Sequence, residues 1–133
     1  MKIHGGCHCG KITYEADIDP ENTSICHCTD CQTMSGAAFR GVVRAQKEDF
    51  RLNGQPKVYL KTAESGNKRV QAFCPDCGTH LYATSEKDQQ IFGIRLGTVK
   101  ERDRLTPKRQ VWTRSAQKWA MDLEAIPRVE KQQ

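Results

Sequence analysis

Seven cysteines in three short clusters are the feature that most limits how this chain can fold. The clusters are Cys7 and Cys9, then Cys26, Cys28 and Cys31, then Cys74 and Cys77. An odd number would leave one cysteine unpaired in a disulfide framework, and the C-x-C and C-x-x-C spacings are typical of metal sites. Zinc binds thiolates in tetrahedral shells. The sequence therefore predicts bound zinc rather than disulfides.

The length of 133 residues suits a single domain, expected over residues 1–125, with a polar tail over 126–133. A mean hydropathy of −0.71 and a hydrophobic fraction of 37% indicate a modest core, which metal sites would reinforce. No apolar run approaches the roughly 18 residues of a membrane span, so no membrane partner is expected. The start, MKIHGGCHCGKITYEA, lacks the apolar run of a secretory signal, which predicts the cytoplasm, where thiols stay reduced.

Short strands divided by turns make up most of the pattern, which predicts a mainly β fold. Alternating apolar and polar residues predict a strand over 11–18, followed by a turn at DPEN. The further strands are expected over 38–45, 57–61, 69–73, 80–85 and 90–99. Asn53-Gly54 predicts a turn, and residues 63–68 predict a hairpin loop. We expect a small domain pinned by metal.

One short helix is expected near the second cysteine cluster. Thr29 as N-cap and Gln32 three positions later match the capping-box pattern. Gly36 would end this helix, because glycine accepts the left-handed conformation of a C-cap. The alternative at this place is a simple turn.

Two of the cysteine clusters have the local geometry of a four-cysteine site. FCPDCG, residues 73–78, is a strand that leads into a tight C-x-x-C-G turn. The flexible, glycine-flanked GGCHCG, residues 5–10, can supply the other pair of ligands. The favoured structural site is Cys7, Cys9, Cys74 and Cys77, although spacing alone leaves other groupings open.

The remaining cysteines, Cys26, Cys28 and Cys31, form a compact group of three that suits a second zinc. A histidine would close this shell and make the ion structural, whereas water or a substrate in the fourth position would leave a Lewis acid. The histidine candidates are His8, His27 and His80. An unmetallated redox cluster is a further alternative. If Cys31 begins a helix, the helix end favours its thiolate and an anionic thiol or carboxylate ligand.

The charge balance argues against a nucleic-acid partner. The formal net charge is +5, but seven thiolates and two Zn²⁺ ions would add about −7 and +4 and leave about +2. The basic stretch over 95–114 is more typical of a solvated loop, because Glu101 and Asp103 interrupt it and aromatic residues are not interleaved.

Four segments in this order resemble one known family. They are GGCHCGKITYEA, CHCTDCQTMSGAAF, FCPDCGTHLY and VWTRSAQKWA, and they span residues 5–120. The chain resembles the glutathione-dependent formaldehyde-activating enzyme family, which includes centromere protein V. The resemblance implies a zinc-bound β-tent of two antiparallel sheets. It also implies a structural zinc on Cys7, Cys9, Cys74 and Cys77 and a catalytic zinc on Cys26, Cys28 and Cys31.

The activity implied by the resemblance is that of a carbon–sulfur lyase. Such an enzyme joins formaldehyde to glutathione and gives S-(hydroxymethyl)glutathione. The expected partners are a small thiol such as glutathione and a small aldehyde. Of the two zinc ions, we expect the one held by three cysteines to be the more labile. Members of the family often carry basic residues where this chain has Gln32 and Thr33. Arg40 and Arg44 are therefore candidates to hold an anionic thiol.

Two other functions stay open from the sequence. A non-catalytic zinc module for protein or nucleic-acid contacts would have two filled zinc shells. A methionine sulfoxide reductase would keep a reactive cysteine late in the chain, and the absence of cysteine after Cys77 disfavours it. No general base is evident. The ionisable side chains nearest the trio in sequence are His8, His27 and Asp30.

Overall fold

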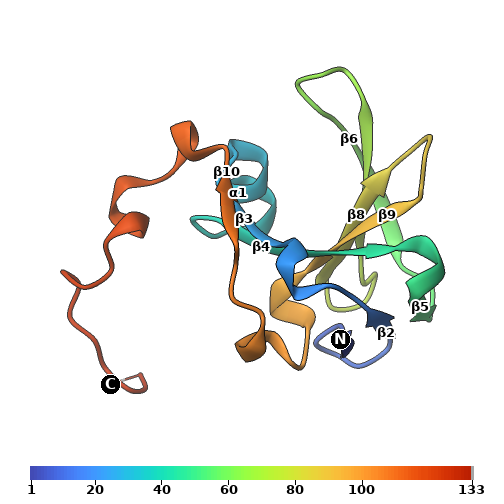
Figure 1. The fold of residues 1–133 in the computed structure, drawn as a ribbon, viewed down its shortest axis with the longest axis horizontal. Coiled ribbons are helices and arrows are strands. Elements are labelled where there is room, and N and C mark those ends of the chain that lie inside the picture. The colour runs from blue at the N-terminus through green and yellow to red at the C-terminus, as the bar shows by residue number, and fades with distance from the viewer. Residues whose placement is uncertain (133) are drawn as a thin grey trace.

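The computed structural model describes residues 1–132, which form a mainly β structure with two sheets and one α-helix (Figure 1). The smaller sheet has the order β1 (Lys2–Gly6), β2 (Thr13–Asp17) and β5 (Phe50–Asn53). The larger sheet has the order β10 (Arg109–Val111), β3 (Thr23–Cys26), β4 (Arg40–Gln46), β9 (Ile91–Arg95), β8 (His80–Ser85), β7 (Lys68–Phe73) and β6 (Lys57–Thr62). The helix is α1 (Thr29–Ser35).

Short 3-10 helices lie between the strands or follow the last of them. They are η1 (Pro20–Asn22), η2 (Lys47–Asp49), η3 (Leu96–Thr98), η4 (Arg102–Arg104), η5 (Thr113–Ser115) and η6 (Lys118–Met121). The strand expected over 90–99 ends at Arg95 because η3 follows. The Thr98 hydroxyl donates to the Arg95 carbonyl at 2.8 Å, and such a local bond competes with strand pairing.

The expected fold class, a mainly β protein of two sheets with one short helix, is confirmed. In residues 1–132 one pairing departs from the antiparallel expectation, because β10 runs parallel to β3. The sequence pattern also did not indicate β1, β3, β5 or β10. These strands have only five, four, four and three residues, too few for alternation to stand out.

The core lies where the two sheets meet. In β1 and β2 of the smaller sheet, buried residues alternate with more exposed ones, as expected for strands that bury one face. Aromatic rings join the sheets, since Phe50 of the smaller sheet lies 5.4 Å from Tyr82 and 5.3 Å from Phe92 of the larger one. The largest fully buried apolar side chains are Ile3, Ile12, Leu81, Ile94, Leu105, Val43 and Val99.

The helix α1 forms where it was expected, but its N-cap is Cys28 and not Thr29. The Cys28 Sγ atom accepts a hydrogen bond from the Cys31 N–H at 3.3 Å. The Gln32 side chain does not close a capping box, because its amide donates to the carbonyls of His27 and Ser115. Gly36 ends the helix with φ of 67°, as expected.

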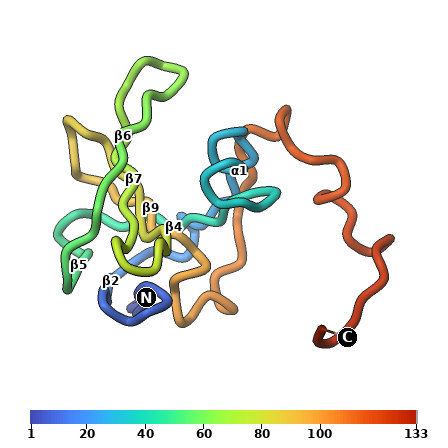
Figure 2. The backbone as a smooth tube through the Cα atoms, turned by 180° about the vertical axis from the view of Figure 1, so that it is seen from behind, coloured from blue at the N-terminus to red at the C-terminus, as the bar shows by residue number. Residues whose placement is uncertain are grey.

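After β10 the chain leaves the sheets and runs apart from them to the C-terminus (Figures 1 and 2). Its attachment to α1 passes through Gln32, which donates to the Ser115 carbonyl at 3.0 Å and accepts from the Gln117 amide at 3.0 Å. The tail expected over 126–133 lies in this segment, except for residue 133, which is outside the described residues. Among the helices described, none is both long and apolar enough to span a membrane.

Candidate functional site

Four cysteines gather where the β1–β2 loop meets the β7–β8 turn. Cys7 and Cys9 follow β1, Cys74 and Cys77 follow β7, and the four Sγ atoms lie within 4.8 Å of one another. The sulfurs of Cys7 and Cys9 are 3.6 Å apart, and those of Cys9 and Cys74 are 3.8 Å apart. A tetrahedral zinc shell with Zn–S bonds of about 2.3 Å separates its sulfurs by about 3.8 Å. This donor set fits a four-thiolate zinc site.

Hydrogen bonds to these sulfurs come from neighbouring residues. The Ile12 N–H donates to Cys7 Sγ at 3.3 Å, and the Thr79 hydroxyl lies 3.2 Å from Cys77 Sγ. The Thr79 hydroxyl and backbone lower the pKa of Cys77 to about 5, so this sulfur is a thiolate at neutral pH. In the metal-free cluster, negative charge therefore lies on Cys77.

The second cluster, which we call the trio, consists of Cys26, Cys28 and Cys31. Cys26 ends β3, Cys28 caps α1 and Cys31 lies in the first turn of α1. Their Sγ atoms lie within 4.8 Å of one another, and no His, Asp or Glu of residues 1–132 joins them at that distance. The trio thus offers three sulfurs and one open position to a tetrahedral ion.

A buried arginine sets the electrostatics of the trio. The Arg40 Nη2 atom donates to Cys31 Sγ at 3.4 Å. The hydrogen bond from Cys26 and the charge of Arg40 lower the pKa of Cys31 to about 5. The same contact with Cys31, together with burial, raises the pKa of Cys26. The negative charge of the metal-free pair therefore resides on Cys31.

None of the three histidine candidates lies at the sulfurs of the trio. His27 is buried, and its Nε2 atom lies 2.7 Å from Gln110 Oε1, so it links β10 to the start of α1. His80 stacks on Phe73 with ring centroids 6.2 Å apart, and burial and the charges of nearby arginines lower its pKa. His8 is exposed in the β1–β2 loop.

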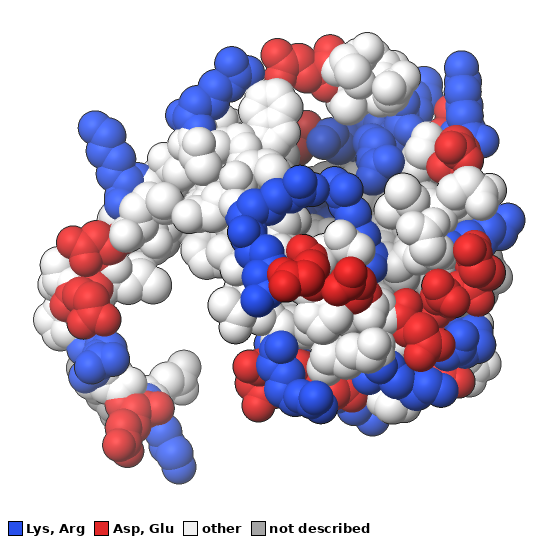
Figure 3. Space-filling model, viewed as in Figure 1, with Lys and Arg blue, Asp and Glu red and all other residues white. Residues whose placement is uncertain are grey.

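The trio opens into a pocket of about 480 Å³, which we call the trio pocket. Its basic lining residues are Arg40, Arg44, Lys61, Arg69 and Arg95, and in the described chain no acidic residue lines it. Figure 3 shows Lys and Arg side chains inside a hollow between α1 and β6. Asp30, the other residue considered as a base, lies at the edge of α1 and pairs with Lys61 at 3.0 Å. The pocket is therefore strongly cationic.

Sequence reasoning found part of this lining and missed the rest. Arg40 and Arg44 were expected near the trio, and both line the pocket, since alternate residues of β4 share a face. Arg69 and Arg95 were missed, because they lie on β7 and β9, and only the pairing of strands brings them to the same face. No local signal in the sequence could have identified them.

Trp112 brings the late Trp-Thr-Arg-Ser segment to the same pocket. It is the one non-glycine residue in the described chain with a positive φ, at 58°. This conformation is unfavourable for a bulky side chain and often occurs at functional sites. The Arg114 guanidinium lies 5.0 Å from the centroid of the Trp112 ring and stacks on it.

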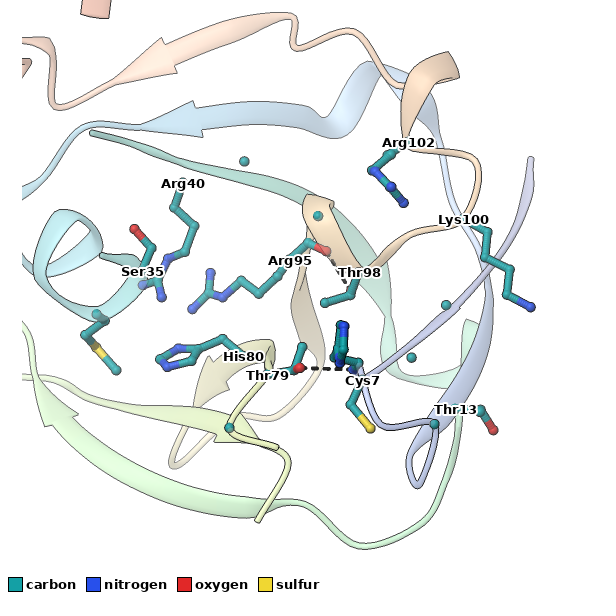
Figure 4. A pocket seen from close by; sticks show the side chains of 18 of the residues that line it. Cys7, Thr13, Ser35, Arg40, Thr79, His80, Arg95, Thr98, Lys100 and Arg102 are labelled. Carbon is teal, nitrogen blue, oxygen red and sulfur yellow. Dashed lines mark hydrogen bonds between the residues drawn. The ribbon is translucent and has the colours of Figure 1, made fainter. Parts of the chain in front are cut away.

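A larger cavity of about 790 Å³ lies beside the trio pocket. Arg40 and Arg95 line both, and Cys7 of the four-cysteine cluster lines the larger one. Figure 4 shows Arg40, Arg95 and His80 extending into this cavity toward α1. Arg40 and Arg95 thus lie between the trio pocket and the larger cavity that Cys7 lines.

The fold and the two clusters define a small β protein with a four-thiol and a three-thiol candidate metal site. The family model described as "Glutathione-dependent formaldehyde-activating enzyme" matches residues 2–115, and the chain belongs to this family.

The individual relatives have modest sequence identity to this chain. The chain is 29% identical over 92 residues to a protein of Penicillium rubens and 27% identical over 93 residues to one of Podospora anserina, both provisionally named glutathione-dependent formaldehyde-activating enzymes. The alignments cover 66% of this chain but 47% and 42% of the relatives, so the chain spans less than half of their length.

A crystal structure of a Rhodobacter sphaeroides protein from a structural genomics programme has a similar fold. The TM-score is 0.60 at 20% identity, with 83% of this chain and 99% of the other covered. At this identity the likeness supports the fold alone.

Proposed function

We propose that this protein is a zinc-dependent carbon–sulfur lyase or synthase that acts on the adduct of a small thiol and a small aldehyde. The observation that carries the proposal is the trio, which has three sulfurs within 4.8 Å and no fourth ligand among residues 1–132. Membership of the family favours glutathione as the thiol and formaldehyde as the aldehyde. The product would be S-(hydroxymethyl)glutathione.

In this proposal the two clusters have different roles. The structural zinc is held by Cys7, Cys9, Cys74 and Cys77, and the catalytic zinc by Cys26, Cys28 and Cys31. Zinc bound to the trio would supply Lewis-acid chemistry and favour the thiolate form of an added thiol. All seven cysteines are free thiols, and a reducing compartment such as the cytoplasm would keep them available for metal.

The reaction needs one new bond. The thiol sulfur attacks the aldehyde carbon, the carbonyl π bond breaks, and the proton lost by the thiol ends on the new hydroxyl oxygen. The protein would contribute by holding the two reactants together. Arg40 and Arg95 are buried cations beside the trio and would stabilise the negative charge that develops on oxygen. The reverse reaction releases thiol and aldehyde.

The experiment that tests the proposal combines zinc analysis with X-ray absorption at the zinc edge. Reduced protein is expected to hold about two zinc ions per chain, with about 3.5 sulfurs per zinc on average. Addition of glutathione is expected to raise this average to about 4, because its sulfur enters the open position. The variant Cys28→Ser should lose this response.

An unchanged zinc shell after glutathione addition would overturn the proposal. It would mean that the trio is already closed to thiols, and a non-catalytic zinc module would then be the better description. As a check of chemistry, exchange NMR with labelled formaldehyde should show faster adduct formation with wild-type protein than with Cys28→Ser.

A further inference from the structure

Four arginines around the trio pocket lack an acidic partner. They are Arg40 and Arg44 on β4, Arg69 on β7 and Arg95 on β9, and no ion pair of the described chain includes them. Arg40 and Arg95 are 6% and 7% exposed, and three of their guanidinium nitrogens have no hydrogen-bond partner. Arg40 donates to Cys31 Sγ at 3.4 Å and Arg95 donates to Gln71 Oε1 at 2.7 Å, and neither has a carboxylate partner within residues 1–132. Buried cations whose hydrogen bonding is incomplete are costly. Such a cluster therefore points to an anionic ligand.

Strand pairing places Arg44 and Arg69 on opposite sides of a pocket floor that is formed by the small residues Gly93 and Ala83. Arg44 of β4 is opposite Gly93 of β9, Gly93 is opposite Ala83 of β8, and Ala83 is opposite Gln71 of β7. Arg69 lies two residues before Gln71 and so faces the same side. Because Gly93 and Ala83 have little or no side chain, a ligand can lie between Arg44 and Arg69. All five residues line the trio pocket.

The arginines differ in depth and therefore in what they can bind. Arg40 and Arg95 are buried beside the sulfurs, whereas Arg44 is exposed and Arg69 is partly buried farther along the floor. Three thiolates, one Zn²⁺ and an added thiolate carry a net charge of about −2. Arg40 and Arg95 balance this charge. Arg44 and Arg69 remain, with two positive charges and no ion pair within residues 1–132. Arg44 also borders a second pocket, which Asp17, Asp19 and Asp49 line, whereas no acidic residue in this range lines the trio pocket.

We infer that Arg44 and Arg69 form a carboxylate-binding subsite through which the trio pocket selects small thiols with two carboxylates. The inference rests on the proposed function, because it takes a thiol as the ligand of the open position. Guanidinium groups bind carboxylates through two parallel hydrogen bonds. The pocket volume of about 480 Å³ lies in the range of small-molecule sites, which is roughly 300–1,000 Å³. Thiols without carboxylates leave both arginines unpaired and bind more weakly.

The test uses S-methylglutathione, which keeps both carboxylates but cannot form a thiolate. Calorimetric titration of zinc-loaded protein at low salt compares this probe with its diethyl ester, in which both carboxylates are masked. Wild-type protein is expected to bind the free acid about tenfold or more tightly than the ester. The variant R44Q/R69Q is expected to lose about tenfold in affinity for the acid and little for the ester.

The matched control is R104Q/R128Q, which removes the same charge from two exposed arginines that do not line the trio pocket. It should bind the probe as wild type does, and zinc content and circular dichroism verify that each variant is folded. The inference is overturned if wild type does not bind the acid or binds acid and ester equally. It is also overturned if R44Q/R69Q binds normally, or if the control loses affinity equally.

If the proposed function is wrong, the zinc-edge spectrum and the probe titration would give a different pair of results. The zinc-edge spectrum would then stay unchanged when glutathione is added, while S-methylglutathione would still separate R44Q/R69Q from the control. If the spectrum changes but the probe does not separate the variants, the thiol site stands and the carboxylate subsite is wrong.

Discussion

Arg40 contacts the trio directly and also lines the rest of the trio pocket. Its guanidinium donates to Cys31 Sγ at 3.4 Å, is buried, and lines both cavities. A charged donor beside a metal-ligating sulfur favours the thiolate that the metal needs. The effect of Arg40 on the trio is therefore electrostatic, and a neutral side chain of similar length should remove it.

At this scale we predict the outcome of Arg40→Gln. Zinc affinity of the trio should fall about tenfold in competition with a chromophoric chelator, because a partner of a ligand is lost. Contact with Cys26 and the charge of Arg40 depress the pKa of Cys31 to about 5, so its thiolate persists until the pH falls to that value. In metal-free Arg40→Gln the pKa rises, and ultraviolet thiolate absorbance should disappear at a higher pH.

Two controls accompany this variant. The thiolate of Cys77, also with a pKa of about 5, depends on Thr79 and should titrate unchanged. Arg104→Gln, at an exposed position, should leave both titrations and the zinc affinity unchanged. An unaltered titration of Cys31 in Arg40→Gln would contradict the role of Arg40.

Among the elements, the helix α1 is too short to be stable in isolation. It has seven residues, whereas isolated helices shorter than about 12–15 residues are marginal in water. The Cys28 sulfur caps its start, Gly36 ends it, and Gln32 ties it to the C-terminal segment. Two of the three trio cysteines are therefore placed by a helix that depends on its ends.

Gly36→Ala tests this dependence. Gly36 has φ of 67°, and an added Cβ would meet nothing within 4 Å, so the cost is backbone strain alone, about 1 kcal/mol. Urea unfolding of zinc-loaded protein should show this loss, and the zinc affinity of the trio should fall with it. The matched control is Gly66→Ala, with φ of 89° and equally open surroundings in the β6–β7 loop. It should leave the trio affinity unchanged, and equal affinities in the two variants would refute the link.

At the scale of the whole molecule, the two cysteine clusters constrain the chain differently. The four-cysteine cluster joins residues that are distant in sequence, and even Cys9 and Cys74 are 65 positions apart. The trio lies within one short segment at the end of β3 and the start of α1. A metal in the first cluster therefore holds distant parts of the fold together, while a metal in the trio orders only its surroundings.

This difference predicts the order of metal loss. A graded chelator titration should remove the trio zinc first, because three protein ligands hold it instead of four. Cys74→Ser should abolish cooperative unfolding, since structural zinc contributes on the order of 10–16 kcal/mol in small zinc domains. Cys28→Ser should stay folded with about one zinc per chain. Retention of the trio ion under conditions that strip the four-cysteine cluster would contradict this prediction.

Much of the fold could be predicted because the signals are local. The strand expected over 80–85 matches β8, and the helix near the second cluster matches α1, since alternation and glycine C-caps depend on a few neighbouring residues. The N-cap was misassigned because the capping pattern names hydroxyl and carboxylate side chains, whereas here the Cys28 sulfur is the acceptor.

Local spacing alone indicated the trio and the two halves of the four-cysteine cluster, because C-x-C and C-x-x-C spacings hold sulfurs close whatever surrounds them. The joining of Cys7 and Cys9 to Cys74 and Cys77 was one of several groupings that spacing left open, and the folded chain brings these four together. The surroundings of the trio depend wholly on tertiary packing. The register of β4, β9, β8 and β7 brings Arg69 and Arg95 to the face that carries Arg44, and the same packing directs His27 to Gln110 instead of the sulfurs. Strand register depends on contacts between distant segments, and those contacts leave no mark in a local pattern.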